Sequence, residues 1–470
     1  MMHTSTPSSL PESPNVRQSF PVGVLAACLS TLALLLFAVQ VMSSSMFSLF
    51  ALVYFIVFSA MVAKYSPAAF VLLLWFIFIR LTTMVSGVAI ESGGYMPEMV
   101  MTGFPTGSFV RLALFYTLGI VMAVWFINAL LPKALNPNVP RMPVQRWAPL
   151  VFGLVILLCA WAFFIGLKSG FPLLSGTDRI VYWKEVSNRF LFFFLGNRTI
   201  LAALLGVIFV ATTGLWRRGA LALLILILAL SFLFAEKFTS ICQILFFFIT
   251  PIFLLNPHLQ KDIARRLIPI GILLACLTLP VILVVYGVFT NPAEAIDRLQ
   301  VRATAQAEVW FVADQDDGRI FGINTQLAAY NFRSLFALDA DAMSRSAPYI
   351  GARDFMSQYL ETPRYNSYVE RGVTLTMATE GYLLKVFGWF AGIPFYWVLL
   401  AVYALQVLYF AYALNTYNPL RIIIACKLLV WSNYGLNQGY LWEVIGLPVL
   451  ALMGLIFAAE AILNQSRRTS

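Results

Sequence analysis

The chain has 470 residues, of which 60% are hydrophobic and only 11% charged, and its mean hydropathy is +0.83. No soluble core of this size could bury so much apolar side chain, so the composition excludes a soluble globular protein. The formal net charge is +10, and the distribution of the basic residues along the chain carries more information than their number.

Residues 1–20 are rich in Ser and Pro and have little to bury, so we expect a disordered cytoplasmic tail. Apolar blocks of about 20 residues follow, the length that crosses about 30 Å of hydrocarbon as a helix. They lack the two-residue alternation of a membrane barrel, so helices are expected. About twelve spans are predicted, at roughly 21–42, 46–63, 67–88, 109–131, 149–167, 190–214, 219–235, 238–255, 268–289, 385–413, 420–436 and 441–463.

An even number of spans places both termini, including the short tail at 465–470, on the same side. The connections on that side contain thirteen basic residues against the acids Glu12 and Asp262. By the positive-inside rule this side is cytoplasmic, and topology then accounts for the net charge without a nucleic-acid partner. The basic residues are Arg17, Lys64, Lys133, Arg141, Arg146, Arg217, Arg218, Lys261, Arg265, Arg266, Arg421, Arg467 and Arg468.

Within the first nine predicted helices (21–290), the outer loop at 168–189 is unusually basic. This loop and the start of the next span contain Lys168, Arg179, Lys184, Arg189 and Arg198. Basic residues on the outer side reduce insertion efficiency, so this cluster needs a reason. An anionic ligand is one reason; ion pairs with Asp178 and Glu185, or contacts with lipid headgroups, are the alternatives.

A large periplasmic loop is expected at 291–380, before the last three helices at 381–464. It carries eight arginines and twelve acids. Arg298 and Arg302 stand four residues apart, so on a helix they would lie on one face and could hold one anionic group together. Alternatively, they bridge Asp297, Glu294 or Glu308. The segments INTQLAAYNFRSLFAL and RDFMSQYL have apolar residues at helical spacing and predict helices that pack on the membrane face.

The acidic string FVADQDDGRIFG invites a calcium-loop interpretation. Asp314 and Asp316 fit the first and third ligand positions, but Arg319 replaces the required glycine and Thr325 the required glutamate. No metal site is therefore predicted. A solvated turn between helices is the expected structure of this string.

Charged residues inside spans are costly in lipid and therefore informative. Arg80, in FVLLLWFIFIRLTTMV, is predicted to bind a ligand phosphate or, alternatively, to snorkel or to pair with an acid such as Glu91. Lys237 lies in an outer turn beside Glu236, where a plain salt-bridged turn is the competing interpretation. The two histidines, His3 and His258, lie in the tail and in a cytoplasmic connection. Proton transfer at the outer face would therefore depend on Asp, Glu, Tyr or Lys.

Several segments together resemble the bacterial O-antigen and oligosaccharide repeat-unit polymerases of the Wzy type. The similar segments are KSGFPLLSGTDRIVYWKE, LGNRTILAALLGVIFVATTGLWRRG, AEKFTSICQILFFF and ATEGYLLKVFGWFAGIPF. They cover spans six to ten, and the two arginine-bearing outer loops match the layout of the family. The resemblance implies a GT-C-like architecture in the bacterial inner membrane, with the active site facing the periplasm.

The resemblance also implies a reaction. Such enzymes transfer a glycan from undecaprenyl pyrophosphate to a hydroxyl of a second lipid-linked repeat unit, alongside a flippase and a chain-length regulator. Pyrophosphate is a good leaving group, so neither a metal nor another cofactor is expected. The predicted catalytic residues are Arg298, Arg302 and Glu380, and the predicted pyrophosphate-binding residues are Arg80, Arg179, Arg198 and Lys237. Glu308 and Asp314 are alternative bases, and Glu380 is favoured because the sequence places it at the membrane surface.

Two other functions fit a polytopic chain of this kind. An O-antigen ligase would share the architecture and the arginines. However, the ligases that this chain resembles use a periplasmic histidine, which this sequence lacks. A polysaccharide transporter or flippase would also contain about twelve spans and buried charge. Transporters more often show internal repeats, and none is evident between the two halves.

Overall fold

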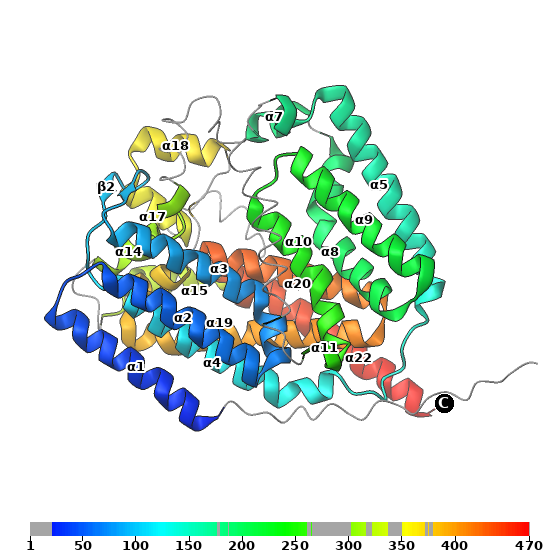
Figure 1. Cartoon of the computed structure of the whole chain (residues 1–470), viewed down its shortest axis with the longest axis horizontal. Coiled ribbons are helices and arrows are strands. Elements are labelled where there is room, and N and C mark those ends of the chain that lie inside the picture. The colour runs from blue at the N-terminus through cyan, green and yellow to red at the C-terminus, as the bar shows by residue number, and fades with distance from the viewer. Residues whose placement is uncertain are drawn as a thin grey trace, which may run out of the picture.

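The computed structural model of the chain is built almost entirely from helices (Figure 1). It describes residues 21–175, 179–186, 188–260, 265, 302–315, 322–336, 350–371, 375 and 379–469. Within these ranges the strands are β1 (Tyr95–Met96) and β2 (Met101–Thr102), which form an antiparallel hairpin. Nine of the described helices are long and apolar enough to cross a membrane. The prediction of an all-α polytopic membrane protein is confirmed.

The long helices follow the predicted spans. They are α1 (Val22–Val41), α2 (Met46–Tyr65), α3 (Pro67–Glu91), α4 (Ser108–Ala134), α5 (Ala148–Ser169), α8 (Arg189–Ala211), α9 (Gly214–Leu233), α10 (Phe238–Leu254), α19 (Thr379–Thr416), α20 (Pro419–Gln438) and α22 (Leu447–Thr469). The span predicted at 268–289 lies outside the described residues. Two helices fall outside the set of nine: α10 has only 17 residues, and Arg421, Lys427 and several amides lower the hydropathy of α20.

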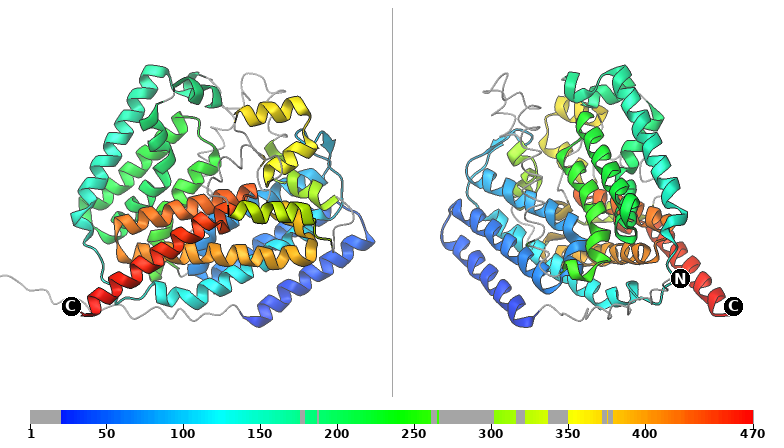
Figure 2. Two further views of the ribbon diagram at one scale, coloured as in Figure 1. Left: turned by 180° about the vertical axis from the view of Figure 1, so that it is seen from behind. Right: turned by 45° about the vertical axis from the view of Figure 1, so that its right-hand side comes forward.

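The bundle has two groups of helices joined by a central pair. On one side α2 packs against α3 and α4, and on the other α8 packs against α5, α9 and α10. Between them α19 contacts α4, α20 contacts α8, and α19 and α20 contact each other (Figures 1 and 2). Side chains from α3, α19 and α20 therefore meet inside the protein.

The long loop forms helices that pack on this bundle. They are α14 (Glu308–Gln315), α15 (Thr325–Leu335), α17 (Ala352–Tyr359) and α18 (Thr362–Arg371), and two of them, α15 and α17, lie in the segments predicted to be helical. Asn324 begins α15 as a side-chain cap that accepts a hydrogen bond from the Leu327 backbone N–H. The Trp310 indole on α14 donates to the Ser108 carbonyl at 3.0 Å, which ties α14 to the first turn of α4.

The shorter elements lie at the ends of the long helices. The connection between α5 and α8 contains α6 (Pro172–Ser175) and α7 (Arg179–Val186). A 3-10 turn, η1 (Val144–Arg146), precedes α5, and α11 (Pro257–Gln260) and α21 (Trp442–Ile445) follow α10 and α20.

The start of the tenth predicted span is wrong by six residues. The span was expected from residue 385, but α19 begins at Thr379 and continues for 38 residues to Thr416. A straight helix of that length would measure about 57 Å, well beyond about 30 Å of hydrocarbon. Gly388 breaks it, with a φ of +66° that glycine adopts without steric cost. Glu380, expected at the membrane surface, therefore lies in the first turn of a helix and is only 1% exposed.

Candidate functional site

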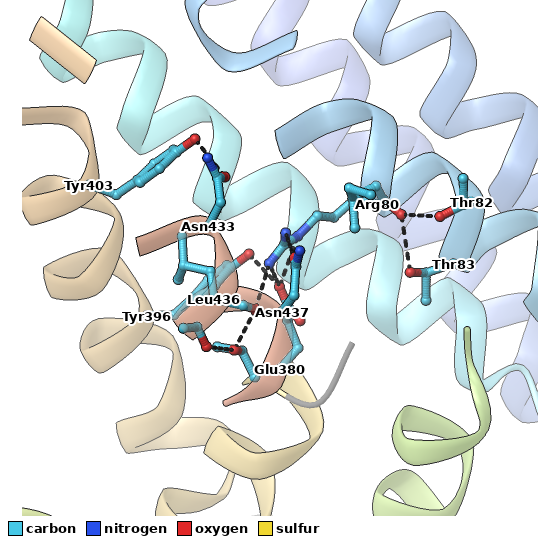
Figure 3. Close-up of polar contacts among 12 residues, drawn as sticks. Arg80, Thr82, Thr83, Glu380, Tyr396, Tyr403, Asn433, Leu436 and Asn437 are labelled. Atoms are coloured by element: carbon cyan, nitrogen blue, oxygen red, sulfur yellow. Dashed lines mark hydrogen bonds and ion pairs between the residues drawn. The ribbon is translucent and has the colours of Figure 1, made fainter. Parts of the chain in front are cut away.

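A buried ion pair joins two residues that the sequence analysis had selected separately. Arg80 of α3 and Glu380 of α19 are each 1% exposed, and Arg80 Nη2 lies 2.8 Å from Glu380 Oε1 (Figure 3). Tyr396 of α19 and Asn437 of α20 complete a group of four polar side chains, which we call the Arg80 centre. Its members come from three helices far apart in sequence.

Each guanidinium nitrogen of Arg80 has an acceptor within the protein. Nε and Nη2 both donate to Glu380 Oε1, at 3.2 and 2.8 Å, and Nη1 donates to Asn437 Oδ1 at 3.2 Å. Nη2 also donates to the Leu436 carbonyl at 3.3 Å, and the Phe76 ring lies 3.9 Å from the Arg80 Cζ. All three guanidinium nitrogens are thus occupied in this conformation, and four of the five N–H donors have acceptors within the protein.

The end of α20 is suited to receive a cation. The last carbonyls of a helix have no partner within it and carry the negative end of the helix dipole. Leu436 and Asn437 lie in the last turn of α20. The Arg80 guanidinium therefore donates hydrogen bonds to the C-terminal end of this helix, to the Leu436 carbonyl and the Asn437 side chain. The Thr379 hydroxyl donates to the same Leu436 carbonyl at 2.5 Å, which fastens the first residue of α19 to this turn.

The Glu380 carboxylate is held asymmetrically. Its Oε1 accepts hydrogen bonds from Arg80 and from the Tyr396 hydroxyl, the latter at 2.8 Å. Its Oε2 is buried and has no hydrogen-bond partner among the described residues. One oxygen is therefore fixed by charged and neutral donors, whereas the other is available to accept a proton or a hydrogen bond from a ligand.

Close helix packing positions the Tyr396 ring. A Cβ atom at Gly119 of α4 would lie 2.4 Å from a ring carbon of Tyr396, so only glycine fits there. The ring also contacts Phe115, with a centroid separation of 5.5 Å. The hydroxyl is consequently directed at Glu380 by packing from α4.

The other predicted phosphate-binding residues lie in different surroundings. Arg198 of α8 is 8% exposed, donates to the Leu195 carbonyl and to Ser231 Oγ, and pairs with Glu236 at 3.2 Å. Lys237 follows Glu236 and is exposed. Within the described contacts, Arg198 shares no partner with Arg80. That Arg198 and Lys237 bind pyrophosphate stays a prediction.

Three further predicted residues are only partly placed. Arg298 lies outside the described residues. α7 begins at Arg179, whose side chain lies outside what the structure describes. Arg302 is exposed and has helical backbone, and its charge opposes the rise in the pKa of Glu98 that burial causes.

One expectation about the acids is confirmed in kind and another is wrong. Arg80 pairs with an acid, as one alternative expected, but the acid is Glu380 and not Glu91, whose Oε1 instead accepts from Thr106 and from the Ser108 backbone N–H. Asp314 does not belong to a solvated turn. Its side chain lies on α14 and is 2% exposed. It accepts hydrogen bonds from Nε and Nη2 of Arg111 on α4, and the shortest of these is 2.5 Å. Residues 316–321 of that string lie outside the described residues.

Two glutamates, Glu308 on α14 and Glu98 in the connection between β1 and β2, form a pair of neighbouring carboxyl groups. Glu308 is 1% exposed, and its Oε1 accepts from Thr304 at 3.1 Å, whereas its Oε2 has no hydrogen-bond partner among the described residues. Burial and the neighbouring carboxylate of Glu98 raise the pKa of Glu308 to about 8. Burial also raises the pKa of Glu98, against the opposing effects of Tyr368, Arg364 and Arg302. Glu308 is therefore mainly protonated at neutral pH.

Sequence reasoning missed three of the polar partners. Tyr396 and Asn437 are neutral and lie in apolar helices, where aromatic and amide residues are common and draw no attention. Glu98 lies in a short connection of ordinary composition. The one sequence feature that pointed to this group was a charged residue inside an apolar block, and that residue is Arg80.

Comparison with known proteins gives one match. The family model described as a family of unknown function (DUF6418) matches residues 346–453. No curated protein and no solved structure matches the chain. The matched segment includes Glu380, Tyr396 and Asn437 but not Arg80. Over less than a quarter of its length, the chain is thus similar to a family whose function is unknown.

Proposed function

We propose that this protein is a surface-polysaccharide polymerase of the inner membrane, with its active site at the periplasmic face. The donor is a glycan linked to undecaprenyl pyrophosphate, and the acceptor is a hydroxyl of a second lipid-linked repeat unit. The proposal rests on the sequence resemblance and on one structural observation, the asymmetric carboxylate of Glu380.

That observation fits the demands of the reaction. A base for a sugar hydroxyl must be ionised, fixed in direction and able to accept a proton. Arg80 and Tyr396 hold Oε1 of Glu380, and Oε2 has no partner in the described part of the chain. Glu380 lies in the first turn of α19, directly after the long loop, where a substrate at the outer face is nearest to the bundle.

The reaction proceeds by substitution at the anomeric carbon of the donor. The acceptor oxygen forms a bond to that carbon while its proton passes to Glu380 Oε2. The bond from the carbon to the pyrophosphate oxygen breaks, and its electron pair leaves with undecaprenyl pyrophosphate. The protonated Glu380 then returns its proton to solvent, so the enzyme is regenerated without a metal or redox cofactor.

The departing pyrophosphate requires positive charge outside the Arg80 centre. Arg302 is exposed, and Arg298 stands four residues earlier in the sequence. Guanidinium groups bind phosphate oxygens in a fork and stabilise the charge that develops as the bond breaks. The two arginines are thus assigned to the leaving group, and Glu380 to the acceptor.

The alternative bases fit less well. Asp314 already receives the Arg111 guanidinium through both of its oxygens. Glu308 has a pKa raised to about 8 and holds its own proton at neutral pH. Of these three candidate bases, Glu380 is the one that combines a directly paired cation with a carboxylate oxygen that has no hydrogen-bond partner among the described residues.

Deletion and complementation test the proposal. In a bacterium that carries this gene, deletion is expected to leave surface glycans one repeat unit long, and the wild-type gene should restore the ladder. Glu380→Gln keeps the size of the side chain but removes the base, so polymer formation should fall by at least about 100-fold. Gels of surface polysaccharide and turnover of purified lipid-linked units provide the measurements.

Glu460→Gln is the matched control because Glu460 also pairs with a buried arginine, Arg421, on other helices of the bundle. At equal membrane levels this variant should retain polymer. Bare core without any repeat unit after deletion would instead indicate a ligase or a flippase. Full polymer from Glu380→Gln would remove Glu380 from the chemistry.

A further inference from the structure

A second polar site lies at the opposite ends of the two central helices. A pocket of about 210 Å³ is lined by Pro140, Arg141, Met142, Thr416, Asn418 and Arg421. Thr416 ends α19 and Asn418 caps α20, whereas the Arg80 centre lies at the start of α19 and the end of α20. The 20 residues of α20 span about 30 Å, so the two sites face opposite sides of a membrane.

The pocket carries positive charge that the described residues do not neutralise. Arg421 pairs with Glu460 at 2.5 Å. Arg141 donates to the neutral Asn415 Oδ1 at 2.9 Å and lies 5.2 Å from the centroid of the Tyr417 ring, and no acidic partner occurs among the described residues. A guanidinium has five N–H donors, so most of those on Arg141 remain available to a ligand.

The walls of the pocket are fixed before any ligand binds. The Met142 backbone N–H donates to the Thr416 carbonyl at 2.9 Å, and Asn415 Nδ2 donates to the Asn136 carbonyl at 2.9 Å. Asn418 accepts from the N–H groups of Leu420 and Arg421, and Tyr417 is held at a φ of +55°. Left-handed backbone is rare for an aromatic residue and is maintained only where the surroundings enforce it.

We propose that this pocket binds a phosphate group, with Arg141 as its main ligand and Arg421 in support. Its volume equals that of several water molecules at about 30 Å³ each, enough for a phosphate with bridging water. The charge distribution predicts this side to be cytoplasmic, where anionic lipids gather beside basic residues. The phosphate belongs either to an anionic lipid headgroup or to a soluble phosphate, and the site is independent of the proposed polymerase activity.

Lipid retention by the full-length protein tests the proposal. The protein is prepared in nanodiscs of phosphatidylcholine alone or with added phosphatidylglycerol. Native mass spectrometry then counts retained lipid, and thermal unfolding is measured in both. We expect preferential retention of phosphatidylglycerol and a higher unfolding temperature, and Arg141→Gln should weaken retention about tenfold. A rise in unfolding temperature with inorganic phosphate in phosphatidylcholine alone would instead assign the site to a soluble phosphate.

Arg146→Gln is the matched control, since Arg146 is exposed, close in sequence and not part of the lining. It should retain lipid as the wild type does. Paired replacement of Arg421 and Glu460 by glutamine tests the supporting arginine without leaving its partner charged. Equal retention of both lipids with no effect of phosphate would overturn the proposal, as would equal losses in Arg141→Gln and Arg146→Gln.

Discussion

Two buried glutamates in this protein have the same exposure but different surroundings. Glu380 and Glu308 are each 1% exposed, and each has one buried oxygen without a hydrogen-bond partner among the described residues. Glu380 pairs directly with a guanidinium and accepts from a tyrosine hydroxyl. Glu308 accepts from the Thr304 hydroxyl and the Glu98 backbone. It also lies near the carboxylate of Glu98 and the more distant charge of Arg364.

This difference sets the charge of each side chain. A buried carboxylate stays ionised where a cation compensates the loss of water, and it takes up a proton where none does. Depth of burial alone therefore says little about chemical role. Glu380 is held in a direct ion pair with Arg80, whereas Glu308 is an acid whose pKa is raised to about 8.

The largest effect is expected when Arg80 is removed. Arg80→Ala leaves the Glu380 charge buried without its cation, which costs about 3–5 kcal/mol of unfolding free energy. Chemical unfolding in mixed micelles would measure this loss. Replacing the pair together, Arg80→Met with Glu380→Leu, should recover most of the stability because well-packed apolar residues substitute for a buried ion pair, although polymer formation stays absent.

The paired variant also separates charge from packing. Arg80 lies over the Phe76 ring, so part of the cost of Arg80→Ala is lost contact. If the paired variant is as unstable as Arg80→Ala, packing and not the stranded carboxylate accounts for the loss.

Glu308 predicts a dependence of stability on pH. Its pKa is raised from 4.5 to about 8 in the folded protein. Stability is highest below pH 4.5, where the carboxyl is protonated in both the folded and the unfolded state. It falls as the pH rises from 4.5 to about 8, because only the unfolded state then loses the proton, and the total loss is on the order of 5 kcal/mol. Thermal unfolding between pH 4.5 and 9 should show this decline, and Glu308→Gln, which stays neutral, should reduce it.

Glu361→Gln provides the comparison for that pH series. Glu361 is exposed, immediately before α18, so the decline with pH should persist in this variant. An unchanged decline in Glu308→Gln would mean that another group, such as Glu98, carries the titration.

Within the described residues, long helices follow the predicted spans because apolar blocks of about 20 residues depend only on local composition. The end of the long loop was predicted less well, since Gly388 allows a helix to begin before the apolar block and then change direction. No local pattern in ATEGYLLKVFGWFAGIPF distinguishes a broken helix from a loop followed by a span.

The contents of the site were predicted in part. Arg80 was selected because charge in an apolar span is costly, and Glu380 because of its place at the loop's return. Their direct pairing across 300 residues of sequence was not predicted, because a single sequence does not specify which distant side chains meet. The Arg111–Asp314 pair was missed for the same reason.

The smallest predicted effect tests whether the Glu380 carboxylate is charged. Tyr396→Phe removes a hydroxyl that donates to Glu380 Oε1 at 2.8 Å, whereas Tyr403→Phe removes one that donates to the neutral Asn433 Oδ1 at 3.0 Å. Both hydroxyls are buried on α19, so the variants differ mainly in the charge of the acceptor. Hydrogen bonds to charged groups contribute about 1.5–3 kcal/mol and neutral ones about 0.5–1.5 kcal/mol, so Tyr396→Phe should lower the unfolding free energy more. In a Glu380→Gln background the two variants should lose similar amounts of unfolding free energy, because the acceptor of Tyr396 is then neutral. Equal losses of unfolding free energy in the wild-type background would argue that Glu380 is protonated despite Arg80, and so unable to act as the base.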